Sequence, residues 1–223
     1  MTSSTAQKTC IIFDIDGTLV QSVAFDGELY EQAIREVLNI PLESDRSHYE
    51  HVTDIGILRQ AMHEHDLKPS VQAEQAVKLR FCELIFEYIL ENPSHIQAVS
   101  GALGFIDKLS QRSDIVFGFA TGGWRETAQA KLLAIGFDTS KFPNTSFASS
   151  NDHVARTDIM RCSEQQLALS DKDRRIYFGD GPWDQLASQQ LDYEFVAIGD
   201  KLKHSPQFED FSRAEDIFEA LAL

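Results

Sequence analysis

The chain has 223 residues, of which 43% are hydrophobic, and it carries 35 acidic against 20 basic side chains, for a formal net charge of −15. This length fits one medium domain, or a core domain with a smaller insertion, and the hydrophobic fraction suffices for a proper core. The negative charge would repel nucleic acid and anionic membranes, so neither is an expected partner.

The three cysteines, Cys10, Cys82 and Cys162, lie far apart and form no CxxC pair. We therefore expect neither a disulfide framework nor a zinc site. Residues 1–9 are polar, and the apolar run at residues 11–13 is far too short for a signal peptide or a membrane span. These features predict a soluble, cytoplasmic protein.

The first strong element is the continuous apolar run at residues 10–13, which ends at Asp14. Continuous hydrophobicity is typical of a strand that is covered on both faces in a parallel sheet. From about residue 21 to residue 97 helical periodicity dominates, and we predict no strand there. Two apolar faces with spacings of three or four residues mark this segment: Leu29, Ala33, Val37 and Leu38, and then Val77, Phe81, Leu84, Ile85 and Tyr88.

From residue 100 onward, strands and helices alternate along the chain. Strands are expected at 115–119, 146–148, 176–178 and 195–198, and helices at 102–109, at 124–135 with Gly136 as C-terminal cap, at about 158–169, from Pro182, and after a capping box of Ser212 and Glu215. This alternation predicts an α/β fold, a Rossmann-like doubly wound parallel sheet with the helical segment inserted after its first strand. In such sheets the binding crevice lies at the carboxyl ends of the strands.

Two acids, Asp14 and Asp16, lie two residues apart in the run DIDGT at residues 14–18, just past the first strand. An EF-hand loop that starts at Asp14 would need Gly and Glu where Leu19 and Phe25 stand, so a calcium loop of this kind is excluded. An ordinary turn rich in Asp and Gly stays open for this motif alone.

Three further features follow in chain order. Thr121 and Gly122 come directly after the strand at 115–119 and its neighbouring alanine, and the glycines there bring backbone N–H groups close to a ligand. Arg156 stands just before a predicted helix. Asp180 ends the strand at 176–178 after one glycine, and Asp184 follows four residues later.

Together these features resemble the four motifs of the haloacid dehalogenase superfamily, in the same order along the chain. The four motifs correspond to residues 14–18, to Thr121, to Arg156, and to Asp180 with Asp184. The chain is most similar to the phosphoglycolate phosphatase-like and β-phosphoglucomutase-like branch. The resemblance implies a core formed by residues 1–20 and 98–223 and an all-helical cap at residues 21–97. Lys is commoner than Arg at the third motif, but Arg keeps the charge and adds bidentate reach to phosphate.

The resemblance also implies the roles of these residues. Asp14 would be the nucleophile that forms an aspartyl-phosphate, and Asp16 would be the general acid and then the general base. Thr121, Gly122 and Arg156 would hold the phosphoryl oxygens. Family members that cleave carbon–halogen bonds lack an acid two residues after the nucleophile, so Asp16 favours phosphoryl transfer over dehalogenation.

A metal ion is expected in this site. A carboxylate and a phosphate oxygen about 4 Å apart repel by roughly 4 kcal/mol per charge pair at an effective dielectric constant of 20. Mg²⁺ held by Asp14, Asp180 and the backbone carbonyl of Asp16 would reverse this repulsion. Asp184 would orient these ligands or Arg156.

These features predict a Mg²⁺-dependent phosphatase for a small phosphorylated metabolite, similar to phosphoglycolate or a sugar phosphate. A sugar-phosphate mutase and a catalytically silent binding or regulatory protein remain alternatives. In the cap, Thr53 and Asp54 interrupt the helical pattern and are candidates for contact with the substrate, because a cap loop faces the active site in similar proteins. The sequence leaves open whether the protein is a monomer or a homodimer.

Overall fold

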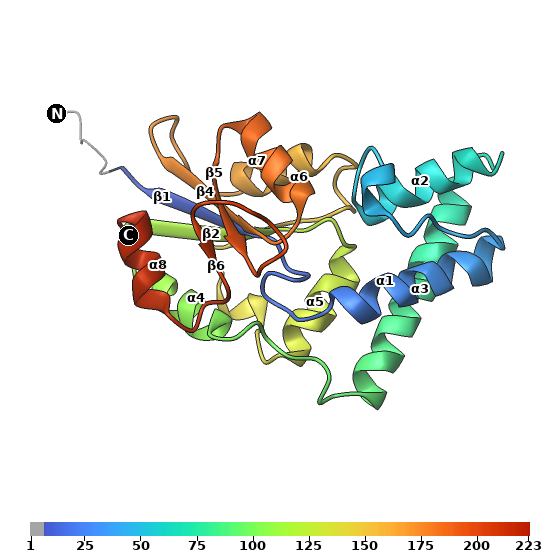
Figure 1. Ribbon diagram of the computed structural model, residues 1–223, viewed down its shortest axis with the longest axis horizontal. Coiled ribbons are helices and arrows are strands. Elements are labelled where there is room, and N and C mark those ends of the chain that lie inside the picture. The colour runs from blue at the N-terminus through green and yellow to red at the C-terminus, as the bar shows by residue number, and fades with distance from the viewer. Residues whose placement is uncertain (1–6) are drawn as a thin grey trace.

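Six parallel strands form one sheet in the order β3-β2-β1-β4-β5-β6, in a computed structural model that describes residues 7–223 (Figure 1). The strands are β1 (Thr9–Phe13), β2 (Ile115–Ala120), β3 (Ser146–Ala148), β4 (Arg174–Gly179), β5 (Glu194–Ile198) and β6 (Gln207–Phe208). The predicted doubly wound parallel sheet is therefore confirmed. β1, the first strand of the chain, lies between β2 and β4, which the sequence reaches only much later.

Helices cover both faces of this sheet. They are α4 (Ala102–Ser110), α5 (Arg125–Ala134), α6 (Arg156–Gln165), α7 (Pro182–Leu191) and α8 (Ala214–Leu221), with a short 3₁₀ helix, η2 (Thr139–Lys141), before β3. In Figure 1, α6 and α7 lie on one side of the strands, and α4 and α8 lie on the other. The continuous apolar run of β1 is explained by this arrangement, because Ile11 and Phe13 belong to the cluster around Phe105, whereas Cys10 and Ile12 belong to the opposite cluster.

Residues 21–97, which we call the cap segment, form helices only. They are α1 (Val23–Leu38), the short 3₁₀ helix η1 (Arg46–His48), α2 (Asp54–Glu64) and α3 (Val71–Glu91), and they lie beyond one end of the sheet (Figure 1). The two ends of the segment lie side by side, because the backbone N–H of Gln21 donates to the carbonyl of Gln97 at 2.9 Å. Among residues 7–223, none of the helices combines the length and the apolar character that a membrane crossing requires.

The cap segment packs against the start of α5. The buried indole of Trp124 lies against the rings of Tyr30 and Phe81, with centroid distances of 5.7 Å and 6.0 Å. The backbone N–H of Asp54 donates to the carbonyl of Gly122 at 2.8 Å, so the loop before α2 is bonded directly to the loop after β2. The cap segment therefore closes over the carboxyl ends of the strands.

Several element boundaries differ from the sequence expectations. The prediction of a capping box at Ser212 and Glu215 was wrong, because α8 has Arg213 at its N-cap and no side-chain cap. The N–H of Ser212 instead donates to the side chain of Asp210 at 2.8 Å. The helix expected at about 158–169 spans Arg156–Gln165, and Trp124 precedes α5. Gly136 does follow α5 with a φ of +86°, a conformation that glycine adopts at little cost.

Candidate active site

The ends of three neighbouring strands supply the centre of the site. Asp14 follows β1, Thr121 follows β2 and Asp180 follows β4, and all three side chains are buried. Because parallel strands end at the same edge of the sheet, these residues meet although they are far apart in the sequence. They line one cavity of about 140 Å³, together with Asp16, Thr53, Asp54, Gly122 and Arg156. Nearly every residue that the sequence singled out thus lies on the same cavity.

The turn after β1 brings its backbone against Asp180. Gly17 has a φ of +85°, and a Cβ atom at this position would lie only 2.1 Å from Oδ2 of Asp180. Only glycine fits there, both for its backbone conformation and for the close approach. The N–H of Asp14 donates to the carbonyl of Phe178 at 2.9 Å, which continues the pairing of β1 with β4 up to the acids.

Asp14, Asp180 and Asp184 form an acidic cluster in which one oxygen of each carboxylate lies within 4.8 Å of the others. Burial, followed by the negative charge of Asp184, raises the pKa of Asp14 well above its ordinary value. Burial also raises the pKa of Asp180, and it raises that of Asp184 to about 6. Arg156 and Lys201 supply only two positive charges to these three carboxylates, and a set of oxygen donors suits Mg²⁺. The cluster therefore fits the metal that the sequence predicted.

The guanidinium of Arg156, the first residue of α6, lies among these acids. Its Nη1 is 3.1 Å from Oδ1 of Asp14 and 2.9 Å from Oδ1 of Asp184. Its Nη2 donates to the carbonyl of Val52 in the cap segment at 3.1 Å, while its Nε is buried without a hydrogen-bond partner. A Cβ atom on Gly122 would lie 2.4 Å from Nη2, so the glycine leaves room for this side chain. Arg156 is thus placed to bind an anion that approaches Asp14.

The loop after β2 is ordered by its own hydrogen bonds. The N–H of Thr121 donates to the carbonyl of Ala148 at 3.1 Å, and the N–H of Gly123 donates to Oγ1 of Thr121, also at 3.1 Å. Oδ2 of Asp16 and Oγ1 of Thr121 both lie beside Gly123, since a Cβ atom there would be 3.5 Å from each. Asp16 and Thr121 therefore face the same small space.

The two cap candidates are engaged mainly in holding the cap segment against the core. Thr53 caps α2, because its Oγ1 accepts from the N–H of Gly56 at 3.2 Å, and it donates to the carbonyl of Val154 at 2.8 Å. Oδ2 of Asp54 accepts from the N–H of Trp124 at 2.8 Å. Burial and then the charge of Asp26 raise the pKa of Asp54 to about 8.

Three cations near the cavity were not predicted from the sequence. Lys131 is fully buried beside Asp16, Lys201 pairs with Asp180, and Arg46 lines the cavity from the cap segment. Arg46 and Lys201 line the cavity and bring positive charge to it in a very acidic chain, whereas Lys131 lies between two carboxylates. Lys131 had a detectable signal, because it lies three residues after Ala128 on the apolar face of its helix, where a lysine is unusual. Arg46 and Lys201 lie in segments without periodicity and had no such signal.

Comparisons with known proteins bear on the family and on the fold. Residues 11–198 match the sequence model of the haloacid dehalogenase-like hydrolases, whereas no curated protein sequence matches the chain significantly. A hydrolase from Pseudomonas syringae has a similar structure, with a TM-score of 0.73 and 20% sequence identity over 95% of this chain and 98% of that one. A β-phosphoglucomutase from Clostridium difficile has a TM-score of 0.67 and 15% sequence identity, over 97% of this chain and 98% of that one. A protein from Lactobacillus plantarum that is assigned as a phosphoglycolate phosphatase has a TM-score of 0.59 and 18% sequence identity, over 96% of this chain and 99% of that one.

The three similar structures establish the fold. The family model covers most of the chain, including most of β1, all of β2 and β4, and the residues that follow these strands, Asp14, Thr121 and Asp180. The chain belongs to the haloacid dehalogenase-like hydrolase family.

Proposed function

We propose that this protein is a Mg²⁺-dependent phosphatase that hydrolyses the phosphate monoester of a small metabolite through an aspartyl-phosphate on Asp14. One observation carries the proposal: the buried carboxylate of Asp14 lies on a small cavity together with Asp16, Asp180 and the guanidinium of Arg156. A buried carboxylate beside a guanidinium suits attack on a phosphorus atom whose oxygens carry negative charge.

Each residue has a defined task in this proposal. Asp14 attacks the phosphorus atom, while Arg156, the hydroxyl of Thr121 and the backbone of Gly122 hold the phosphoryl oxygens in line. Asp16 gives a proton to the oxygen of the leaving alcohol, and later takes one from the water that attacks the aspartyl-phosphate. The carboxylates of Asp14 and Asp180 and the backbone carbonyl of Asp16 would hold Mg²⁺, which would supply positive charge to the phosphoryl oxygens.

The surroundings of the cavity favour a substrate with a second anionic group. Arg46 lines the cavity, and its Nη1 is buried without a hydrogen-bond partner. A larger cavity of about 440 Å³ adjoins the first and shares Arg46, Val52, Arg156 and Trp183 with it. An unpaired buried guanidinium nitrogen is costly unless a ligand satisfies it. A carboxylate, as in phosphoglycolate, or the second phosphate of a sugar bisphosphate would do so.

A release assay tests this function. Purified protein with Mg²⁺ is offered phosphoglycolate, sugar monophosphates and sugar bisphosphates, and free phosphate and isomerised sugar are both measured, with Asp14→Asn as the control. Release of phosphate by the wild type alone supports the proposal. Isomerised product without release of phosphate would instead identify a mutase, and the absence of both reactions, also with p-nitrophenyl phosphate, would favour a silent binding protein.

A further inference from the structure

Lys131 on α5 is a buried cation between two carboxylates. Its side chain is fully buried, and its Nζ lies 2.5 Å from Oδ1 of Asp16 and 2.5 Å from Oδ1 of Asp26. Burial by itself would lower the pKa of Lys131, but the charges of the two acids outweigh burial and raise the pKa above its ordinary value. A lysine in this position is therefore an ammonium ion, and a buried ion is retained only with well-placed partners.

Lys131 donates a hydrogen bond to one carboxylate oxygen of Asp16 and makes no hydrogen bond to the other. Oδ1 of Asp16 accepts from the ammonium of Lys131 and from the hydroxyl of Ser22. Oδ2 is directed to the opposite side, toward Gly123 in the loop after β2. Two donors on a single carboxylate oxygen fix the rotation of the side chain, so Oδ2 stays beside the space in which a phosphate ester would react.

The same ammonium joins three parts of the molecule. Lys131 belongs to a helix of the core, Asp16 to the turn after β1, and Asp26 to the first turn of α1 in the cap segment. The orientation of Asp16 therefore depends on an ion that the cap segment also holds. Nothing in the four family-like motifs requires a lysine at this position.

We propose that Lys131 is a positioning residue that holds Asp16 in the orientation needed for proton transfer. This proposal rests on the proposed phosphatase activity. In the first step the bond from Asp14 to phosphorus forms, the bond from phosphorus to the leaving oxygen breaks, and the proton of Asp16 moves to that oxygen. In the second step water adds to phosphorus, the bond to Asp14 breaks, and the proton of the water moves to Asp16.

Two esters of nearly equal shape separate positioning from mere structural support. Nitrophenolate leaves readily without a proton, whereas phenolate depends more on the general acid. A misplaced Asp16 should therefore lower kcat/KM for phenyl phosphate more than for p-nitrophenyl phosphate. General damage to the fold would lower both values by the same factor.

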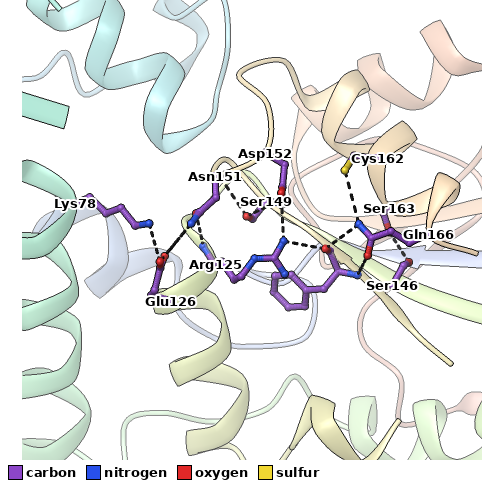
Figure 2. Close-up of polar contacts among 11 residues, drawn as sticks. Lys78, Arg125, Glu126, Ser146, Ser149, Asn151, Asp152, Cys162, Ser163 and Gln166 are labelled. Carbon is purple, nitrogen blue, oxygen red and sulfur yellow. Dashed lines mark hydrogen bonds and ion pairs between the residues drawn. The ribbon is translucent and has the colours of Figure 1, made fainter. Parts of the chain in front are cut away.

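For Lys131→Met, we expect the ratio of kcat/KM for phenyl phosphate to that for p-nitrophenyl phosphate to fall at least about tenfold. The matched control is Lys78→Met. Lys78 also joins the cap segment to α5, because its Nζ pairs with Glu126 at 2.7 Å (Figure 2), but this ion pair does not include Asp16. The control should leave the ratio unchanged.

A second variant keeps the test decisive if Lys131→Met unfolds. Ser22→Ala removes the other donor to the same oxygen of Asp16 with a small change in volume, and we expect a smaller fall of the ratio in the same direction. A folded Lys131→Met protein, or failing that Ser22→Ala, with the wild-type ratio would overturn the positioning role and leave the phosphatase activity standing. A wild type that hydrolyses neither ester would overturn both proposals.

Discussion

Nη1 of Arg156 lies 3.1 Å from Oδ1 of Asp14, although 142 positions separate the two residues in the chain. The fold brings these opposite charges together because the acid follows β1, near the N-terminus, and the cation begins α6, in the second half of the sequence. Asp184 lies 2.9 Å from the same nitrogen, so the guanidinium is fixed between two acids. Such a fixed cation needs little reorganisation when an anion arrives.

If Asp14 is the nucleophile, as proposed, its replacement should abolish turnover without loss of stability. For Asp14→Asn we expect kcat to fall by a factor on the order of 10⁴ to 10⁶, as for other nucleophiles whose loss removes the covalent step. The pKa of Asp14 is raised by burial, so the ionised side chain destabilises the metal-free fold as the pH rises, and Asn removes this effect. Thermal unfolding in EDTA should give an equal or higher Tm for the variant. A fully active variant would refute the assignment of the nucleophile.

Removal of the metal should abolish the activity reversibly. We expect EDTA to stop phosphate release and Mg²⁺ to restore it, since the acidic cluster otherwise lacks a divalent counter-charge. Binding to the folded state alone should also raise the Tm as the Mg²⁺ concentration increases. Asp180→Asn should reduce this shift in Tm, whereas the surface variant Asp171→Asn should not. An unchanged shift in Asp180→Asn would remove that residue from the metal site.

Arg46 should distinguish substrates by their second charge. A hydrogen bond to a charged group contributes about 1.5–3 kcal/mol, so Arg46→Ala should raise KM for phosphoglycolate or a sugar bisphosphate roughly 10- to 100-fold. KM for p-nitrophenyl phosphate, which has no second anion, should change little. The control is Arg59→Ala, another cap arginine, which pairs with Glu74 at 2.7 Å. Equal changes in KM for both kinds of substrate would contradict a second anion site.

Asp54 should make the stability of the protein depend on pH. Its pKa is about 8 in the folded chain, against an ordinary value of 3.8, so between about pH 4 and pH 8 the folded state binds a proton that the unfolded chain has lost. The free energy of unfolding contributed by this group therefore decreases as the pH rises through that window. Asp54→Asn keeps an acceptor for the N–H of Trp124 but does not titrate.

Thermal unfolding at a series of pH values checks this prediction. The Tm of Asp54→Asn should fall less than that of the wild type between about pH 5 and pH 9. Asp171→Asn, an exposed acid, serves as the control and should follow the wild type. Parallel curves for Asp54→Asn and the wild type would show that burial does not raise the pKa of this side chain.

Much of the fold could be predicted because its strands are buried on both faces. Continuous hydrophobicity marks three strands: the run at residues 10–13 and the strands before Thr121 and Asp180. A polar side chain follows each of them, and such a side chain is rare inside a strand that is buried on both faces. Their order along the chain then placed those side chains on one edge of the sheet. The strand β6 has only two residues and no pattern to detect, so its absence from the prediction has a simple reason.

The rest of the site could not be predicted because it depends on packing between segments. Arg46 reaches the cavity from the short 3₁₀ helix η1 and Lys201 from the loop after β5, so their positions follow from how the cap segment and β5 are placed. The expected helix cap at Ser212 failed for a similar reason. A competing turn at Asp210 takes the N–H of Ser212, and sequence spacing alone does not decide between two local hydrogen bonds of similar strength.

The central place of β1 in the sheet has a consequence for synthesis of the protein. Residues 9–13 are synthesised long before their partners on either side, which are residues 115–119 and 174–178. Pairings this distant in sequence are slow to form, because a long stretch of chain must be ordered before they are made. Until β4 has been synthesised, β1 is an apolar strand whose backbone is unpaired along at least one edge. Chaperones bind such exposed strands, and strands of this kind also promote aggregation.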